Sequence, residues 1–179
     1  MTEQETIKLI HDVTVALVPL GNLITLPKDT EVTITQSLGG TYTITTSGSM
    51  YRLENKDADA LGKTHLTFTL AENENIALED RIWNVLRTCY DPEIPVNIVD
   101  LGLIYGIDIT PNADNKSNVI IRMTLTAPGC GMGPIITTDA KEKVLRLSDV
   151  TSVEIELIFD PPWDRSMMSD QAKLELGLF

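Results

Sequence analysis

Cys130 is the residue whose setting in this sequence most favours chemistry. It lies in the segment TAPGCGMGP (126–134), after an alternating apolar stretch and just before Gly133-Pro134. Proline at the first helical position loses only a donor that is unpaired there anyway, so a helix is expected to begin at this point. The free N–H groups and dipole of a helix N-terminus favour an anion, and a thiolate is such an anion. Gly129 and Gly131 would let the backbone approach a bound group closely. The competing interpretation is that Cys130 is a small apolar residue in a tight turn.

The cysteine count limits what metal site the chain can offer. There are two cysteines, Cys89 and Cys130, and no CxxC pair, so one chain cannot supply a closed four-cysteine site. A cluster at Cys130 would need a second chain, a partner protein, or oxygen or nitrogen ligands. Cys89 lies on the apolar stripe of a predicted helix, which favours core packing. The histidines, His11 and His65, fall in the first half, and no local motif makes either one a base for Cys130.

Other ligand classes find little support in the sequence. The glycines around Cys130 are not followed by Lys-Ser/Thr and lack dinucleotide-fingerprint spacing, so we expect no nucleotide. With 26 acidic against 14 basic residues the formal net charge is −12, which disfavours nucleic acid and anionic membranes as partners. No apolar run approaches the roughly 20 residues of a membrane helix, and the polar start does not resemble a signal peptide. A small secreted protein would usually have more cysteines, evenly paired. The two cysteines, together with the lack of a signal-peptide pattern and of a membrane helix, therefore indicate a cytoplasmic, reducing compartment.

The elements that would position these residues form two parts. Residues 1–74 show period-two alternation, as at Val13, Val15 and Leu17, which is typical of half-buried strands. Further strands are expected around residues 32–34, 42–44 and 66–70, with turns at 21–22, 27–29 and 39–40. We predict a small all-β domain over residues 1–74, built as a β-barrel or meander. The polar run 71–75 is expected to join it to a second domain, residues 75–179.

The second part changes period and predicts a compact α/β domain, so the whole chain is expected to be α+β. Ile82, Val85, Leu86 and Cys89 stand at helical spacing, and Asp91-Pro92 should end that helix. Alternating segments at 105–109 and 119–125 predict an antiparallel hairpin. A helix from 133 and a strand at 153–159 then predict a parallel βαβ crossover, hence a three-stranded mixed sheet with flanking helices. A short helix over 169–176 would close the chain.

Three carboxylates, Asp91, Glu93 and Asp100, surround a short stretch bounded by prolines. Taken singly, they are explained by helix-stop and turn chemistry and by solvation of their charges.

Three segments taken together resemble a known family. DPEIPVNIVDLGLIYGI (91–107), TLTAPGCGMGP (124–134) and FDPPWDRSMMS (159–169) are similar to the signature segments of the SufT-like iron–sulfur cluster assembly family. That family shares this domain with PaaD proteins, with eukaryotic cytosolic iron–sulfur targeting factors and with the front end of some Mrp-type cluster carriers. The resemblance covers residues from about 76 to 179. The front part resembles SufT proper through ITLPKDTEVTITQSLGGTYTI (24–44) and the run DADALG (57–62).

The resemblance implies an accessory factor in iron–sulfur protein maturation rather than an enzyme. It implies that Cys130 is the functional and metal-binding cysteine, in a site with Gly129 and Gly131, and that Asp91, Glu93 and Asp100 line one concave face with it. The expected cofactor is a transient iron–sulfur cluster shared between chains, as in a homodimer, or with a partner. The expected partners are iron–sulfur assembly proteins and client apoproteins.

Two other functions stay open from the residues. The chain could be an adaptor without metal that recruits assembly machinery or clients, with Cys130 structural or redox-sensing. It could also be a thiol enzyme with Cys130 as nucleophile, against which the lack of a nearby histidine or second cysteine weighs.

Overall fold

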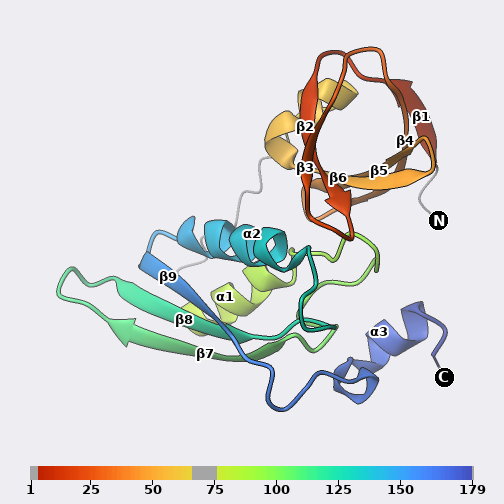
Figure 1. Ribbon diagram of the computed structural model, residues 1–179. Helices are drawn as coiled ribbons and strands as arrows, with labels where there is room; N and C mark the ends of the chain where they lie inside the picture. The colour runs from red at the N-terminus through yellow and green to blue at the C-terminus, as the bar shows by residue number, and fades with distance from the viewer. Residues whose placement is uncertain (1–3, 66–75, 179) are drawn as a thin grey trace. The chain divides into compact units, whose positions relative to one another are not determined.

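The computed structural model describes residues 4–65 and 76–178 and divides the chain into two compact units (Figure 1). The first unit contains residues 1–68 and 92–95, and the second contains residues 69–91 and 96–179. The predicted boundary between residues 74 and 75 lies outside the described residues, as does the strand predicted around 66–70. Each unit is described by itself below.

The first unit is an antiparallel sheet of six strands. Its order is β1-β4-β5-β6-β2-β3, with every neighbouring pair antiparallel. The strands are β1 (Glu5–Lys8), β2 (Val13–Val18), β3 (Leu23–Leu26), β4 (Glu31–Leu38), β5 (Thr41–Thr46) and β6 (Ser49–Leu53). The all-β character of this part is therefore confirmed.

The core of the first unit follows the period of two that the sequence shows. Val13 and Val15 of β2 are buried, as are Val32 of β4 and Ile44 of β5, because alternate side chains of a strand point to one face. The helix η1 (Asn55–Leu61) adds its apolar residues to this core.

The predicted barrel is not closed. Within the described strands, β1 and β3 are the two ends of the sheet order and no ladder joins them. The sheet is not a simple meander either, because β2 lies between β6 and β3. Strand alternation predicts which residues face inward, whereas closure depends on whether the terminal strands meet.

The second unit contains a three-stranded mixed sheet of order β7-β8-β9. β7 and β8 pair antiparallel, and β8 and β9 pair parallel through the connecting helix α2, so the predicted hairpin and βαβ crossover are confirmed. The elements are α1 (Leu78–Leu86), β7 (Ile104–Pro111), β8 (Ser117–Met123), α2 (Gly133–Leu145), β9 (Val150–Leu157), η2 (Arg165–Met167) and α3 (Asp170–Glu175).

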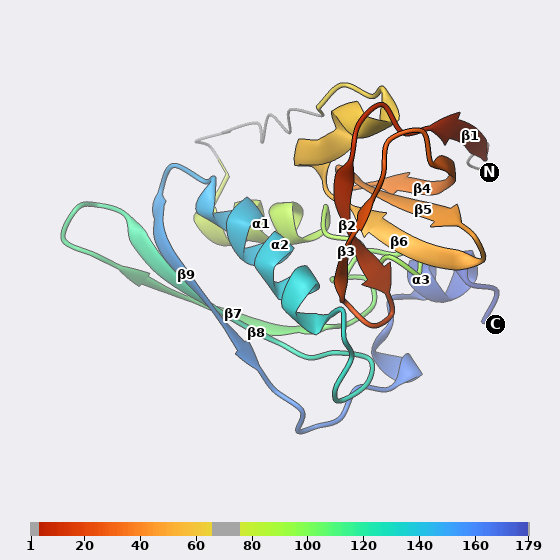
Figure 2. The ribbon, with the colours of Figure 1, turned by 45° about the horizontal axis from the view of Figure 1, so that its top comes forward.

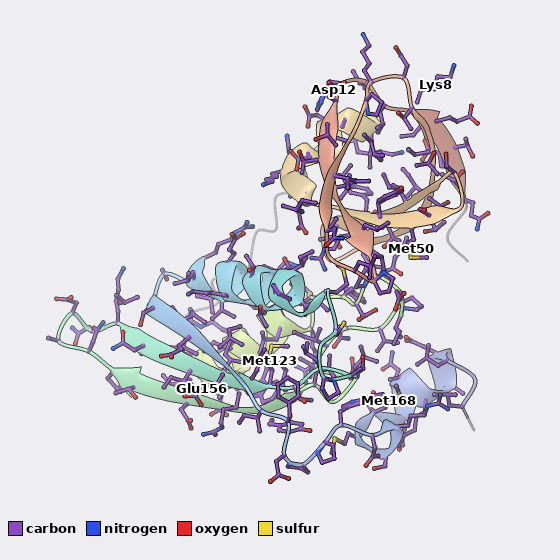
Figure 3. The ribbon with its side chains drawn as sticks, in the orientation of Figure 1. Lys8, Asp12, Met50, Met123, Glu156 and Met168 are labelled. Atoms are coloured by element: carbon purple, nitrogen blue, oxygen red, sulfur yellow. The ribbon has the colours of Figure 1, made fainter. Side chains whose placement is uncertain are left out.

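Helices α1 and α2 lie on one face of this sheet (Figures 1 and 2). Ile82, Val85 and Leu86 of α1 are buried there, as the helical spacing predicted. Met123 of β8, labelled in Figure 3, is also fully buried. The helix ends at Leu86 rather than at Asp91, because its last turn tightens and the N–H of Thr88 bonds to the Val85 carbonyl at 2.9 Å.

In the described part of the chain, no helix has the length and apolar character that crossing a membrane requires.

Candidate functional site

Cys130 lies in the loop between β8 and α2, as predicted, three residues before the first residue of the helix. Its N–H donates to the Ala127 carbonyl at 3.2 Å, and its carbonyl accepts the N–H of Gly133 at 3.0 Å. The residue is partly exposed and is not in a disulfide. The loop thus fixes the backbone of Cys130 on both sides while leaving the residue accessible to a reagent or partner.

The two glycines beside Cys130 differ in backbone conformation and exposure. Gly129 has φ +81°, a left-handed conformation that favours glycine, and an added Cβ would meet nothing within 4 Å. Its exposed position therefore leaves open space next to the cysteine. Gly131 is partly buried. That these glycines serve close approach of a bound group stays a prediction.

Cys89 is almost fully buried, and its thiol contacts the Val85 carbonyl one helical turn back at 3.9 Å. The backbone carbonyl of Cys89 accepts the N–H of Ile98 at 2.9 Å. These contacts support the interpretation of Cys89 as a packed core residue that anchors the start of the first signature segment, residues 91–107.

The three carboxylates occupy different settings. Asp91 is buried, with 9% of its surface exposed, and its N–H faces the Val96 carbonyl at 3.4 Å. Asp100 is partly buried in the same unit. Glu93 is exposed and falls in the stretch 92–95 that groups with the first unit. The predicted common concave face of these residues with Cys130 stays a prediction.

Asn97 organises the turn that carries Asp100, and the sequence interpretation missed it. Its Oδ1 accepts the N–H groups of Val99 and Asp100 at 3.0 and 2.9 Å, and its Nδ2 donates to Asp100 Oδ2 at 2.5 Å. An asparagine that accepts the N–H groups two and three residues later is a known turn-former. Asn97 ahead of the apolar run Ile98-Val99 was the available signal.

Tyr90 borders this turn. Burial raises the pKa of its phenol above the ordinary value, and the nearby carboxylates of Glu175 and Asp100 raise it further. The carboxylates of Asp100 in the first segment and of Glu175 in α3 therefore both act on Tyr90.

The third signature segment, residues 159–169, folds back onto the first. Trp163 Nε1 donates to the Leu101 carbonyl at 2.8 Å, and the N–H of Ser169 donates to the Asp100 carbonyl at 2.9 Å. The Tyr105 hydroxyl donates to the Pro161 carbonyl at 2.7 Å.

The second signature segment, residues 124–134, is tied to the first at its start. The N–H of Thr124 donates to the Leu103 carbonyl at 2.8 Å. Thr124 is fully buried, and its hydroxyl has no hydrogen-bond partner among the described residues. All three segments that carry the family resemblance are therefore linked by hydrogen bonds in the second unit.

The described residues contain no cluster of three or more His, Cys, Asp or Glu side chains that could hold a metal ion. A single thiolate at Cys130 suits iron but cannot complete a ligand set by itself. The side chains present therefore fit partial ligation, in which other ligands come from elsewhere.

Both histidines make side-chain contacts within the first unit. The ring of His11 is bonded to the Asp12 carbonyl at 2.8 Å and to Asp59 Oδ2 at 2.9 Å. His65 Nδ1 contacts the Asn55 carbonyl at 2.8 Å. These partners all belong to the first unit, and the expectation that neither histidine acts as a base for Cys130 stays a prediction.

Comparison with known proteins identifies the second unit. The profile of a family described as iron–sulfur cluster assembly protein matches residues 79–157. A Porphyromonas gingivalis protein named Fe-S protein maturation auxiliary factor is 49% identical over 105 residues, covering 59% of this chain and 96% of that protein. The Staphylococcus aureus Fe-S protein maturation auxiliary factor SufT is 38% identical over 88 residues, covering 49% and 96%.

A solved structure agrees with these matches. The crystal structure of a domain of unknown function from Bacillus anthracis is 36% identical, with a TM-score of 0.50, and covers 57% of this chain and 93% of that chain. The family profile begins at residue 79, so the resemblance of residues 24–44 and 57–62 to SufT stays a prediction. The family resemblance is confirmed over residues 79–157, which contain the first two signature segments, whereas the third, residues 159–169, lies beyond the profile and stays a prediction. The chain belongs to the iron–sulfur cluster assembly family that includes the SufT-like maturation factors.

Proposed function

We propose that this chain is an accessory factor in iron–sulfur protein maturation, which delivers clusters or helps insert them into client apoproteins through Cys130. The observation that carries the proposal is a free, partly exposed cysteine held by backbone hydrogen bonds in the family's second signature segment. It is supported by relatives named as Fe–S protein maturation auxiliary factors.

The cluster is the cargo of this function, and its ligands are only partly supplied here. Cys130 would bind one iron as a thiolate, and the remaining ligands would come from a second chain, an assembly protein or the client. Holding cargo by one thiolate per chain suits transfer, because fewer bonds must break at release. In this proposal the chain works in the cytoplasm, binds proteins and has no enzymatic activity of its own.

An adaptor without metal is the second candidate. This candidate needs no ligand cluster, and the described residues contain none of three or more ligating side chains. In this case the chain would recruit assembly proteins or clients, and Cys130 would be structural or redox-sensing.

Complementation in cells distinguishes the two. A strain lacking this gene is supplied with wild type, Cys130→Ser or Cys89→Ser, and the activity of iron–sulfur enzymes is measured under iron limitation. The delivery function predicts that only Cys130→Ser loses activity at equal protein level. Full activity of Cys130→Ser would reject delivery through Cys130 and support the adaptor.

A further inference from the structure

Strand β9 is an edge of the three-stranded sheet (Figure 2). Half of its backbone N–H and C=O groups therefore face away from β8. The N–H of Ile158 donates to the Met123 carbonyl of β8 at 2.8 Å. The backbone N–H and C=O groups of the even-numbered residues of β9 therefore point toward β8. Successive residues of a strand point their N–H and C=O groups to opposite sides. The backbone groups of Val153, Ile155 and Leu157 therefore point to the open edge.

An open groove of about 560 Å³ runs along this edge. One wall is the helix α2, through Thr137, Thr138 and Lys141, and the other is β9, through Ser152, Val153, Glu154, Ile155 and Leu157. Leu157 is 44% exposed at the end of the strand, so an apolar side chain is available beside the groove. An added strand would thus find both backbone partners and a surface for its side chains.

The edge strand itself carries two carboxylates, Glu154 and Glu156, and the β8 partner of Glu156 is Arg122, which forms an ion pair with Asp108. Glu154 and Glu156 alternate with the more buried Val153 and Ile155 and are both exposed (Figure 3 labels Glu156), and Glu154 also borders the groove. Neither carboxylate forms an ion pair among the salt bridges of the described residues. A strand added at this edge would place its own alternate side chains directly beside these two charges.

This charge pattern decides between possible occupants. In an antiparallel pair of two β9 strands centred on Ile155, Glu154 of each copy would lie directly opposite Glu156 of the other copy. Like charges directly opposite across a strand pair are destabilising, and they are a known means of preventing edge-to-edge pairing. The edge is therefore suited to a partner strand of opposite charge rather than to itself.

We propose that the β9 edge is a docking site for an extended segment of a partner protein that adds as a fourth strand, with Lys or Arg at the positions beside Glu154 and Glu156. Main-chain hydrogen bonds would provide the binding and the two charge pairs the selectivity. This site lies on β9 and α2 rather than on the Cys130 loop, so it goes beyond the proposed function and can hold if cluster delivery fails.

The test uses the full chain and a labelled synthetic heptapeptide that alternates Lys with Val. Binding is followed by fluorescence anisotropy, and pairing by hydrogen exchange of the Val153, Ile155 and Leu157 amides. Two control peptides are matched to it. The first control peptide alternates Glu with Val. The second keeps the Lys and Val residues, but the backbone amides that would face β9 are N-methylated and cannot donate hydrogen bonds.

We expect the Lys–Val peptide to bind and to slow exchange of the three outward amides, and the N-methylated peptide to do neither. The double variant Glu154→Lys with Glu156→Lys should weaken the Lys–Val peptide by roughly tenfold and should bind the Glu–Val peptide instead. Leu157→Pro removes one outward N–H without removing a bond to β8, and should weaken binding more than Leu157→Ala, which keeps that N–H.

Equal binding of the N-methylated and unmodified Lys peptides would overturn the proposal, because attraction would then be electrostatic alone. Unchanged exchange of the three amides at saturating peptide would overturn it as well. Self-association of the free chain through β9, seen as protection of the same amides at rising protein concentration, would show a second copy as the occupant. The peptide and exchange measurements need only the wild-type chain, so they decide the matter even if Leu157→Pro does not fold.

Discussion

The indole N–H of Trp163 donates to the backbone carbonyl of Leu101 at 2.8 Å, so the third signature segment is bonded to the first across 62 positions of sequence. Leu101 is fully buried, which makes this donor hard to replace by water. The hydrogen bond explains why a tryptophan follows two prolines here: the chain must turn back after β9 and then satisfy a buried carbonyl.

Replacing Trp163 by Phe should therefore destabilise the second unit. The Leu101 carbonyl would lose its donor, which costs about 1–3 kcal/mol for a buried group left unpaired. The free energy of unfolding is measured by urea denaturation followed by circular dichroism. Trp83→Phe is the matched control, since Trp83 lies on α1 and makes no such bond among the described contacts. Equal losses in the two variants would contradict the role assigned to Trp163.

Gly102 should resist substitution for two reasons that can be separated. It has φ +74°, and an added Cβ would collide with the backbone carbonyl of Met167. Gly177 has a similar φ of +66°, but open space around its Cβ position. Gly177→Ala should cost about 1 kcal/mol of stability from the left-handed conformation alone, and Gly102→Ala clearly more. Thermal unfolding of both variants checks this. Equal losses of stability would show that the Met167 backbone moves aside without cost, which would contradict the prediction.

The first unit should depend on pH through His11. Its pKa is raised from 6.5 because its ring is bonded to the Asp12 carbonyl and to the carboxylate of Asp59. The pKa of Asp59 is lowered from 3.8, chiefly by the same hydrogen bond to His11. Both ring partners are acceptors, so the protonated imidazole satisfies them together.

The sign of the effect follows from these directions. A raised histidine pKa stabilises the folded unit below pH 6.5, and this contribution is lost as pH rises through the folded pKa. A lowered aspartate pKa stabilises it above pH 3.8, and this contribution is lost as pH falls through the folded pKa. The Tm of the wild-type first unit should therefore be higher than that of His11→Gln, and the difference should be largest between pH 3.8 and pH 6.5. The difference should shrink toward pH 8–9. NMR signals of the first unit report its Tm, and a pH-independent difference would contradict the pairing.

The two cysteines should differ in chemical access. Cys89 is 1% exposed, whereas Cys130 is partly exposed in its loop. Iodoacetamide should therefore alkylate Cys130 in the native protein and leave Cys89 unmodified until denaturant is added. Mass spectrometry of proteolytic fragments locates the label. Labelling of Cys89 at a rate comparable with Cys130 would show that the second unit opens readily.

Local sequence patterns predicted the elements that repeat a period. The alternation at Val13, Val15 and Ile44 identified β2 and β5, and the spacing at Ile82, Val85 and Leu86 identified α1. The short strands β1 and β3, with four residues each, carry too little alternation to be recognised. β6 was missed because Arg52 is buried within it, against the usual preference of arginine for the surface.

Features that depend on distant contacts could not be predicted from spacing. The Cys130 loop was placed correctly because Gly133-Pro134 is a local helix-start signal. The return of residues 159–169 onto Leu101 and Asp100 depends on hydrogen bonds between irregular segments, which no periodicity encodes. The prediction of a closed barrel was wrong for the same reason, because closure requires a ladder between the distant strands β1 and β3, which local alternation does not encode.

The central claim is that Cys130 binds the cluster cargo, and anaerobic reconstitution tests it most directly. Wild type, Cys130→Ala and the matched control Cys89→Ala are incubated with iron and sulfide, desalted, and compared by absorbance spectra and by bound iron and sulfide. We predict that wild type and Cys89→Ala acquire a cluster with its thiolate-to-iron absorbance, and that Cys130→Ala does not. Equal iron and sulfide in wild type and Cys130→Ala would contradict direct cluster binding at Cys130.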